Sequence, residues 1–325
     1  MTYYLFKLQF TAPVHFGDSF SAVSLSSSEM TFCADRLFSA LCQTAVRQGD
    51  RGVELLYNLV QSRQLRFSDA FPWKGEQLYL PRPCLEAKTV RDTDASDRKA
   101  MKKIAYISIN QYTYFLQSLS DGDPIDPKTL LTRFGEASVV TRAAILEGKD
   151  ALPYAVGQYR FDAACGLYFL AALAKDDLFR PLFQLVRQLG LGGIGGKVSS
   201  GYGSFVVERA CPVRALDEMQ ASFLLNALDM PDADLWISLT TSLPKEEELD
   251  AALHGALYQI VRRAGFVQTT NLKGPEKKEE QFFLAAGSTF RHPYRGDVYD
   301  VAPENCPHPV YRYAVPLFLG VKKHG

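Results

Sequence analysis

The stretch from Gly190 to Gly203 has the composition of a loop that binds phosphate groups. Seven of its fourteen residues are glycine, and the others include Lys197, Ser199 and Ser200. Glycine permits positive φ angles and lets a backbone approach a partner closely. Exposed N–H groups, small hydroxyls and a single cation suit the phosphates and riboses of a nucleic acid. We therefore predict that this loop follows a nucleic-acid backbone.

Two common phosphate-binding motifs do not explain this loop. Gly190, Gly192 and Gly195 match the spacing GxGxxG, but that dinucleotide motif follows a strand and opens a helix, whereas this loop follows a helical pattern and precedes a strand. The Walker A motif fails because Leu191 and Val198 stand where it requires glycine and serine or threonine. The alternative is a flexible helix-to-strand connector, but a connector does not need so many glycines.

His15 is a second residue that could carry chemistry, and it lies beside Phe16 and Gly17 at the end of an N-terminal strand pattern. Histidine titrates near neutral pH, so three roles are open. It could contact RNA, act as a general acid and base, or form a hydrogen bond to nearby loop backbone. We predict RNA contact for His15, Phe16 and Gly17.

The start of the first predicted helix carries Asp35, Arg36 and Ser39. Asp35 is predicted to cap this helix, with Thr31 as the alternative cap. Arg36 and Ser39 are predicted to reach RNA, because helix N-termini attract phosphates. A salt bridge is an equally good interpretation of Arg36.

Four more candidates lie farther along the chain. Arg142 is placed on a predicted hairpin and would contact RNA or remain a solvated strand residue. Tyr202 would stack on a base or pack in the core. Gly287 and Ser288 are predicted to provide a second backbone contact to RNA.

Two groups of residues are ambiguous. The cations of residues 82–103 read as an exposed insertion, in which a charge run is usually a solvated face. They are Arg82, Lys88, Arg91, Arg98, Lys99, Lys102 and Lys103. An apolar cluster follows and suits either the core or a partner surface. It comprises Tyr112, Tyr114, Phe115 and Leu116.

The composition limits the classes of function. The chain has 325 residues, 36 basic and 36 acidic side chains and no net charge, so an RNA site must be local rather than a general basic coat. The six cysteines form no CxxC pair and the five histidines show no zinc spacing, so no metal or cofactor is predicted. The N-terminus does not resemble a signal peptide and no apolar run is long enough for a membrane span, which predicts a cytoplasmic protein.

The element pattern predicts an α+β protein of two ferredoxin-like (RRM-like) domains. Residues 1–208 give the order β-α-β-β-α-β, with an insertion at about 82–162 that contains a hairpin over 138–162, and with the glycine-rich loop at 190–203. Residues 209–325 are predicted as a degenerate second domain after a linker at about 209–232. Its predicted elements are a strand at 235–239, a helix over 249–261 and strands near 266–269, 280–290 and 309–319.

A resemblance to a known family covers nearly the whole chain. The helix followed by GLGGIGGKVSSGYGSF and a strand resembles the C-terminal signature of the RAMP superfamily of CRISPR proteins. APVHFGDS and MTFCADRLFSAL near the N-terminus, GLYFLAAL before the loop, AGSTFR at 286–291 and HPVYRYAVPLFLGV at 308–321 resemble one subunit of type III-A effector complexes. That subunit holds the 5′ handle of the guide RNA. The glycine loop by itself indicates only the superfamily.

The resemblance implies a non-catalytic subunit that caps the guide RNA 5′ handle. It also implies two protein neighbours, a large polymerase-like subunit and a backbone RAMP subunit, with target RNA met indirectly through a thumb hairpin. No catalytic residue is predicted. The residues predicted to bind RNA are His15, Phe16, Gly17, Arg36, Ser39, Arg142, Gly192, Gly193, Ile194, Gly195, Gly196, Lys197, Ser199, Ser200, Gly201, Tyr202, Gly287 and Ser288.

Two alternatives remain open at this stage. One is a metal-independent endoribonuclease that processes CRISPR repeat RNA, because related RAMP nucleases use an early histidine comparable to His15. No paired His/Tyr/Lys constellation is visible to support it. The other is the equivalent subunit of a different CRISPR type.

Overall fold

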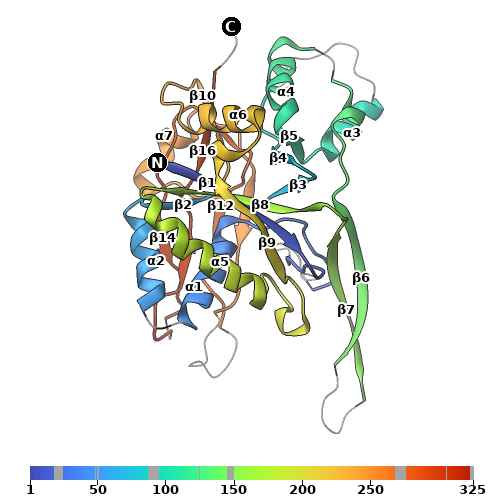
Figure 1. Ribbon diagram of the computed structural model, residues 1–325, viewed down its shortest axis with the longest axis vertical. Coiled ribbons are helices and arrows are strands. Elements are labelled where there is room, and N and C mark those ends of the chain that lie inside the picture. Colours follow the sequence, from blue (N-terminus) through green and yellow to red (C-terminus); the bar gives the residue numbers. More distant parts are fainter. Residues whose placement is uncertain are drawn as a thin grey trace.

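A computed structural model describes most of the chain (Figure 1). The described residues are 1–17, 25–47, 49, 51–86, 95–123, 125–144, 150–267, 276–304 and 306–322, with the side chains of 95–98 excepted. Within these ranges, no helix is both long and apolar enough to span a membrane. The protein is a mixed α/β structure whose strand pairs are antiparallel.

The largest sheet is built around the N-terminal strand β1 (Thr2–Phe10). This strand pairs with β8 (Cys165–Leu173) on one side and β9 (Phe205–Pro212) on the other, and the order is β5-β4-β3-β8-β1-β9, with β2 also paired to β8. Every residue of β8 is buried, as its unbroken apolar sequence predicts. The remaining strands are β2 (Leu65–Phe67), β3 (Phe71–Lys74), β4 (Gln77–Pro81) and β5 (Tyr106–Ser108).

Three helices cover one face of this sheet. They are α1 (Ala34–Val46), α2 (Arg51–Gln61) and α5 (Phe179–Gly192). The predicted apolar stripe of α1 is confirmed, since Leu37, Phe38 and Leu41 are buried against Phe6 and Phe169 of the sheet. The helix α2 was not anticipated from the sequence.

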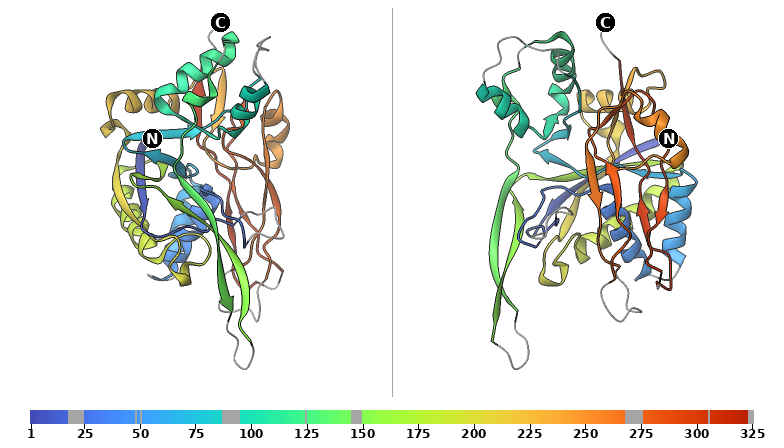
Figure 2. Two further views of the ribbon diagram at one scale, coloured as in Figure 1. Left: turned by 90° about the vertical axis from the view of Figure 1, so that its right-hand side faces the viewer. Right: turned by 180° about the vertical axis from the view of Figure 1, so that it is seen from behind.

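The C-terminal strands contribute to the packing on the other face. Leu5 and Leu170 of the sheet join a cluster that contains Ile237 and Leu319 from the C-terminal half. The left panel of Figure 2 shows α5 and the orange and red C-terminal strands on opposite sides of the body. The two halves therefore share their cores, and β9 runs past the predicted boundary at residue 208. That boundary stays a prediction.

A long hairpin projects from the body. Strands β6 (Gly135–Ala144) and β7 (Leu152–Phe161) pair along their whole length, from Gly135 opposite Phe161 to Ala144 opposite Leu152. Figure 1 shows them extending away from the main sheet. The predicted hairpin at 138–162 is confirmed, although it begins slightly earlier. Its turn, residues 145–149, lies outside the described residues.

The insertion before the hairpin contains two further helices, α3 (Ala95–Lys103) and α4 (Ile109–Asp121). The ambiguous aromatic cluster divides between core and surface. Tyr112 and Phe115 are buried, whereas Tyr114 is 56% exposed. Lys88 and Arg91 of the basic segment lie outside the described residues, while Lys99, Lys102 and Lys103 lie on α3.

The C-terminal half differs from its predicted pattern. The apolar stripe at 249–261 was predicted as one helix, but α7 is short because Gly255 adopts a φ of +64° directly after its C-cap His254. The residues that follow are extended, and Leu257 forms a bridge to Thr289. The predicted linker at 209–232 contains a helix, α6, which the sequence analysis missed. The elements are α6 (Glu218–Leu228), β10 (Leu235–Ser238), α7 (Leu249–Leu253), β11 (Ile260–Arg263), β12 (Gln281–Leu284), β13 (Thr289–Phe290), β14 (Val298–Asp300), β15 (Tyr311–Tyr313) and β16 (Phe318–Val321).

Short 3-10 turns complete the described structure. They are η1 (Pro127–Thr129), η2 (Asp176–Leu178), η3 (Val198–Ser200), η4 (Val213–Ala215) and η5 (Glu246–Glu248). The predicted strand near 266–269 is reduced, within the described residues, to a single bridge between Phe266 and Lys277. The strand predicted at 280–290 is divided into two short strands, β12 and β13, and the strand predicted at 309–319 into β15 and β16. β12 does not pair with β13, and β15 does not pair with β16.

Asp69 joins the two halves of the chain. Its buried carboxylate accepts hydrogen bonds from the backbone N–H of Ala34, at 2.8 Å, and from the N–H and hydroxyl of Thr241, at 3.0 Å and 2.6 Å. Burial raises the pKa of this carboxyl from 3.8 to about 6, although the three hydrogen bonds oppose the shift. Asp69 is therefore a pH-sensitive contact in the interior.

We expect the free energy of unfolding to fall as the pH rises through about 6, because the buried carboxyl then carries a charge. The pKa of Asp69 is higher in the folded state than in the unfolded state. Its contribution to the free energy of unfolding is therefore fully present below pH 3.8 and is lost as the pH rises through about 6. The contribution amounts to about 3 kcal/mol. Urea unfolding of the wild type and of Asp69→Asn at about pH 4 and pH 7.5 measures it, since the asparagine variant lacks the titrating group. Equal pH dependence in the two proteins would show that Asp69 does not titrate as described.

Candidate nucleic-acid interface

The glycine-rich loop begins where α5 ends and closes on itself. Gly193 takes a φ of +82° at the C-cap of α5, and the 3-10 turn η3 lies between Lys197 at φ +60° and Gly201 at φ +83°. The N–H of Ile194 donates to the carbonyl of Gly203 at 3.0 Å. The side chain of Ile194 is only 1% exposed, so it anchors the loop in the core.

Several of the glycines are required by contacts within the chain. The N–H of Gly196 donates to the carbonyl of His15 at 2.8 Å. A Cβ on Gly195 would come within 2.8 Å of the same carbonyl, and a Cβ on Gly196 within 2.6 Å of the His15 ring. Glycine is thus needed here for close packing of the loop on the His15 segment.

His15 is held by a backbone contact. Its side chain is buried, and its Nδ1 donates to the carbonyl of Gly157 on β7 at 2.7 Å. The neighbouring Val14 pairs with Tyr159 of the same strand. This is the backbone hydrogen bond of a loop histidine, and it joins the loop after β1 to the middle of the hairpin.

Phe16 and Arg36 hold the backbone of the His15 segment in place. Phe16 is fully buried, and its ring packs against Phe10 and Phe32. Arg36 donates to the carbonyl of Gly17 at 3.1 Å, and burial together with nearby Arg263 lowers the pKa of its guanidinium. The roles of Phe16 and Arg36 in this structure are to fix the loop backbone. Ser39 lies one turn along α1 and is partly buried.

The prediction that Asp35 caps α1 is wrong. The N-cap position is Cys33, without a side-chain cap, and Asp69 accepts the hydrogen bond from the first N–H instead. Asp35 forms a 3.1 Å ion pair with Arg263 and accepts the N–H of Tyr313 at 3.1 Å. The alternative cap, Thr31, is hydrogen-bonded to the hydroxyl of Tyr106.

The middle and outer part of the hairpin meets the glycine loop through polar contacts. Arg142 donates to the hydroxyl of Tyr202 at 3.4 Å, and that hydroxyl donates to Gln158 at 3.0 Å. The ammonium of Lys197 lies 4.9 Å from the ring centre of Tyr154, within range of a cation–π contact. Because the Tyr202 ring is only 3% exposed, its face is not open for stacking on a base in this structure.

One face of this arrangement is open to solvent. Val198, Ser199, Ser200 and Gly201 are exposed. A tight turn of hydroxyls and small residues, with the cation Lys197 at its start, can bind phosphate and ribose oxygens. The structure thus brings together three segments that are distant in sequence: the His15 loop, the hairpin and the glycine loop.

Gly287 and Ser288 lie apart from this assembly. Gly287 has a φ of +89°, and its carbonyl accepts the N–H of Cys84 at 2.8 Å. Ser288 is fully buried, and its hydroxyl accepts the N–H of Gln259 at 3.4 Å. The bond of Gly287 joins the C-terminal half to the segment after β4, whereas that of Ser288 lies within the C-terminal half.

Tyr154, Gly157 and Gln158 were not predicted as site residues from the sequence. Each lies on the predicted hairpin, but its contact with the loop depends on how β7 lies beside the end of β1. The run AVGQYR in β7 offered one signal, a glycine inside a strand, which often marks close backbone approach. A Cβ on Gly157 would come within 2.6 Å of Ser26 and Ser27. Among the described residues, no group of His, Cys, Asp and Glu is placed to hold a metal ion.

Comparisons with known proteins agree over almost the entire chain. A family model described as the CRISPR Csm4 C-terminal domain matches residues 231–321. The chain is 36% identical over 320 residues to the CRISPR system Cms protein Csm4 of Mycobacterium tuberculosis strain H37Rv, covering 98% of this chain and 97% of that protein. It is 30% identical to the protein of the same name from Streptococcus thermophilus, covering 98% of this chain and 99% of that protein.

Solved structures with the same fold are also found. One is the Csm3–Csm4 subcomplex of the type III-A CRISPR-Cas interference complex, with 17% identity, a TM-score of 0.63, and coverage of 99% of this chain and 100% of the other. Another is a Csm1–Csm4 cassette in complex with pppApA, with 20% identity, a TM-score of 0.62 and full coverage of both chains. At these identities the likeness establishes the fold.

Proposed function

The chain belongs to the Csm4 family of CRISPR proteins, and on this premise we propose that it is a non-catalytic subunit that holds the guide RNA 5′ handle in a type III-A interference complex. The observation that carries the proposal is the exposed turn Val198–Gly201 beside the hairpin. It offers an RNA strand the hydroxyls of Ser199 and Ser200 and the cation Lys197.

Within this proposal the predicted residues divide into two roles, except Gly287 and Ser288, which lie apart from the RNA surface. Lys197, Ser199, Ser200, Gly201 and Arg142 contact the RNA. The remaining residues hold that surface in position. They are His15, Phe16, Gly17, Arg36, Ser39, Gly192, Gly193, Ile194, Gly195, Gly196 and Tyr202. The bond from His15 Nδ1 to the Gly157 carbonyl supports a structural role for this histidine rather than an acid–base one.

The fold supports an RRM-like first domain at 1–208. The spatial order of strands in the main sheet is β9, β1, β8 and then β2 or β3. The helices α1 and α5 lie on one face of this sheet. This is the arrangement that a β-α-β-β-α-β chain adopts when its two helices pack together on the sheet. We propose residues 209–325 as the second domain, built from small strand pairs.

We propose two protein partners for the chain. The solved relatives occur in a Csm1–Csm4 cassette and in a Csm3–Csm4 subcomplex. These complexes support the proposal that this chain binds a large polymerase-like subunit and a backbone RAMP subunit. Target RNA would then be met indirectly, through the projecting hairpin.

Purification from native cells tests this function. The tagged chain is compared with a variant that combines Lys197→Ala, Ser199→Ala and Ser200→Ala. The wild type should carry guide RNAs that share one constant 5′ tag, together with a large subunit and a backbone subunit, and the variant should lose most of the RNA. Full guide occupancy in the variant would show that the loop does not hold the guide.

Lys197 should make a measurable electrostatic contribution to RNA binding. Neutralising one phosphate on a single strand contributes about −0.7 to the slope of log K against log salt concentration. Lys197→Ala should therefore weaken binding and make the slope less steep by about 0.7. Titrations of fluorescent repeat RNA between about 50 and 200 mM salt measure this change. An unchanged slope would remove Lys197 from the contact surface.

A further inference from the structure

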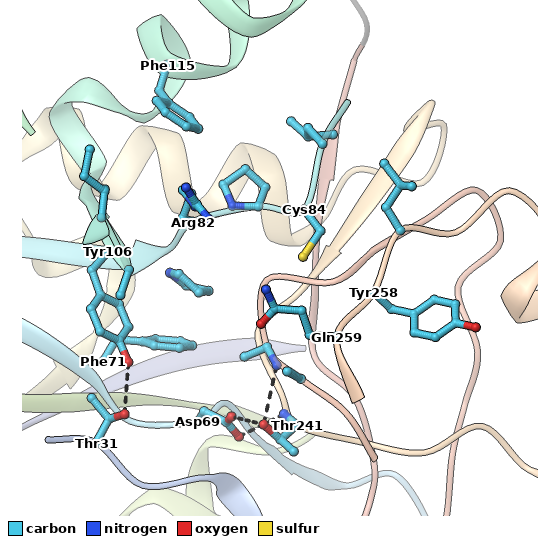
Figure 3. Close-up of a pocket in the computed structure, with 18 of the residues that line it drawn as sticks. Thr31, Asp69, Phe71, Arg82, Cys84, Tyr106, Phe115, Thr241, Tyr258 and Gln259 are labelled. Atoms are coloured by element: carbon cyan, nitrogen blue, oxygen red, sulfur yellow. Dashed lines mark hydrogen bonds between the residues drawn. The ribbon is translucent and has the colours of Figure 1, made fainter. Parts of the chain in front are cut away.

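A large cavity lies where the two halves of the chain meet, and no residue of the glycine loop lines it. Its volume is about 1280 Å³, which exceeds the roughly 300–1,000 Å³ of ordinary small-molecule sites. One wall comes from strands β3 to β5 and the inserted helices, and the other from residues 257–261 and 285–286 (Figure 3). A space of this size can take several side chains of another molecule.

The lining of the cavity is mixed, with slightly more apolar than polar surface. Phe71 from β3 and Phe115 from α4 lie in the same wall, and both are almost fully buried (Figure 3). The hydroxyl of Tyr106 is already engaged with Thr31 at 2.9 Å. Such a mixed lining suits a protein segment that carries both apolar and charged side chains.

The ionisable groups of the lining carry an acidic excess. They are four carboxyl groups, Glu29, Asp69, Glu86 and Asp123, and two cations, Arg82 and Lys102. Arg82 is also engaged within the chain, since it donates to the carbonyl of Met101 at 2.6 Å. The proposed RNA surface is the reverse, because its ionisable contact residues are the cations Lys197 and Arg142. A polyanionic RNA strand is repelled by a net acidic cavity, whereas a cationic protein segment is attracted to it.

The rim of the cavity is held rigidly. The N–H of Cys84 donates to Gly287, and the carbonyl of Cys84 accepts the hydroxyl of Thr289 at 2.6 Å. Gly287 packs so closely that an added Cβ would lie 2.6 Å from the carbonyl of Arg82. A preformed wall lowers the entropy that a partner loses on docking.

From these observations we propose that the cavity docks a protein partner, which inserts an apolar side chain flanked by lysine or arginine. The inference rests on the proposed function, because it requires the chain to work inside an assembly. It assigns RNA and protein to two different surfaces of the molecule, with opposite charge.

Charge reversal at the rim tests the proposal without disturbing the core. Glu86 and Asp123 are both exposed, so Glu86→Lys with Asp123→Lys should fold normally. The matched control reverses two exposed acids outside the lining, with Asp121→Lys and Glu304→Lys. A second variant, Ala286→Trp, fills the cavity from its lining. Each full-length variant is titrated against the purified large subunit, the purified backbone subunit and guide RNA.

The expected result is a loss of about tenfold or more in affinity for one of the two proteins, in both cavity variants. Guide RNA binding and the control variant should remain at wild-type level. Protein affinities within about twofold of the wild type would overturn the inference. A loss of RNA binding with both proteins still bound would also overturn it, because the cavity would then be an RNA site. A wild-type chain that binds neither RNA nor protein would overturn the proposed function as well.

Discussion

Replacing Asp35 with alanine should lower the free energy of unfolding by about 3–5 kcal/mol, because it leaves buried cations without their carboxylate. Asp35 pairs with Arg263 at 3.1 Å, and each side chain is 12% exposed. Arg312 and Lys278 lie close enough for the same carboxylate to favour their charged forms, while burial lowers the pKa of both. The loss would also free the N–H of Tyr313. Urea denaturation at neutral pH measures the change.

Two further variants identify the cause of this loss. The double variant Asp35→Leu with Arg263→Met removes both members of the pair and should recover much of the stability, since apolar replacement of a buried pair is often neutral. Asp177→Ala removes an exposed carboxylate on η2 and should change stability by at most about 0.5 kcal/mol. If Asp35→Ala lowers the free energy of unfolding by less than about 1 kcal/mol, other groups balance the charge of the buried cations.

Gly203→Ala should abolish most RNA retention. Gly203 has a φ of +75°, and a Cβ there would lie 2.1 Å from the carbonyl oxygen of Ile194, a distance that no side chain can accept. The loop backbone must then move, which breaks the bond from Ile194 to Gly203 and displaces the exposed turn. We expect at least a tenfold fall in the guide RNA that co-purifies with the chain, measured against the amount of protein.

Gly75→Ala provides the matched control for backbone strain. Gly75 also has a positive φ, +59°, but nothing lies within 4 Å of the added Cβ. It should lose about 1–2 kcal/mol of stability from the left-handed conformation alone and keep its RNA. Equal RNA loss in the two variants would attribute the effect to general destabilisation rather than to the loop.

The elements with strong local patterns could be predicted from the sequence. The alternating aromatic run of β1 matches the two-residue period of a strand, and the apolar stripe of α1 matches the spacing of a helix. The unbroken apolar run of β8 is typical of a buried strand. The apolar stripe at 249–261 was wrongly predicted as one helix, because its spacing fits a helix as well as it fits the structure observed. Its outcome was decided by the left-handed turn at Gly255 and by the pairing of Ile260 with Leu284 on β12.

The candidate site could be predicted in part. The density of glycine identified the loop, and the hairpin was recognised from its alternation. Contacts between distant segments could not be deduced, because they depend on how the segments pack in three dimensions. Asp35 was interpreted by its position near a helix start, whereas its partner Arg263 lies 228 residues away. The bond from His15 to Gly157 likewise depends on the placement of β7.

Ultraviolet crosslinking of the purified native complex, followed by mass spectrometry, tests the RNA-binding surface most directly. We predict that the constant 5′ nucleotides of the guide crosslink to tryptic peptide 198–209, from the glycine loop, or to peptide 150–160, which covers most of β7 in the hairpin. Crosslinks of those nucleotides to peptides that line the cavity, with none to the glycine loop or to β7, would contradict this prediction.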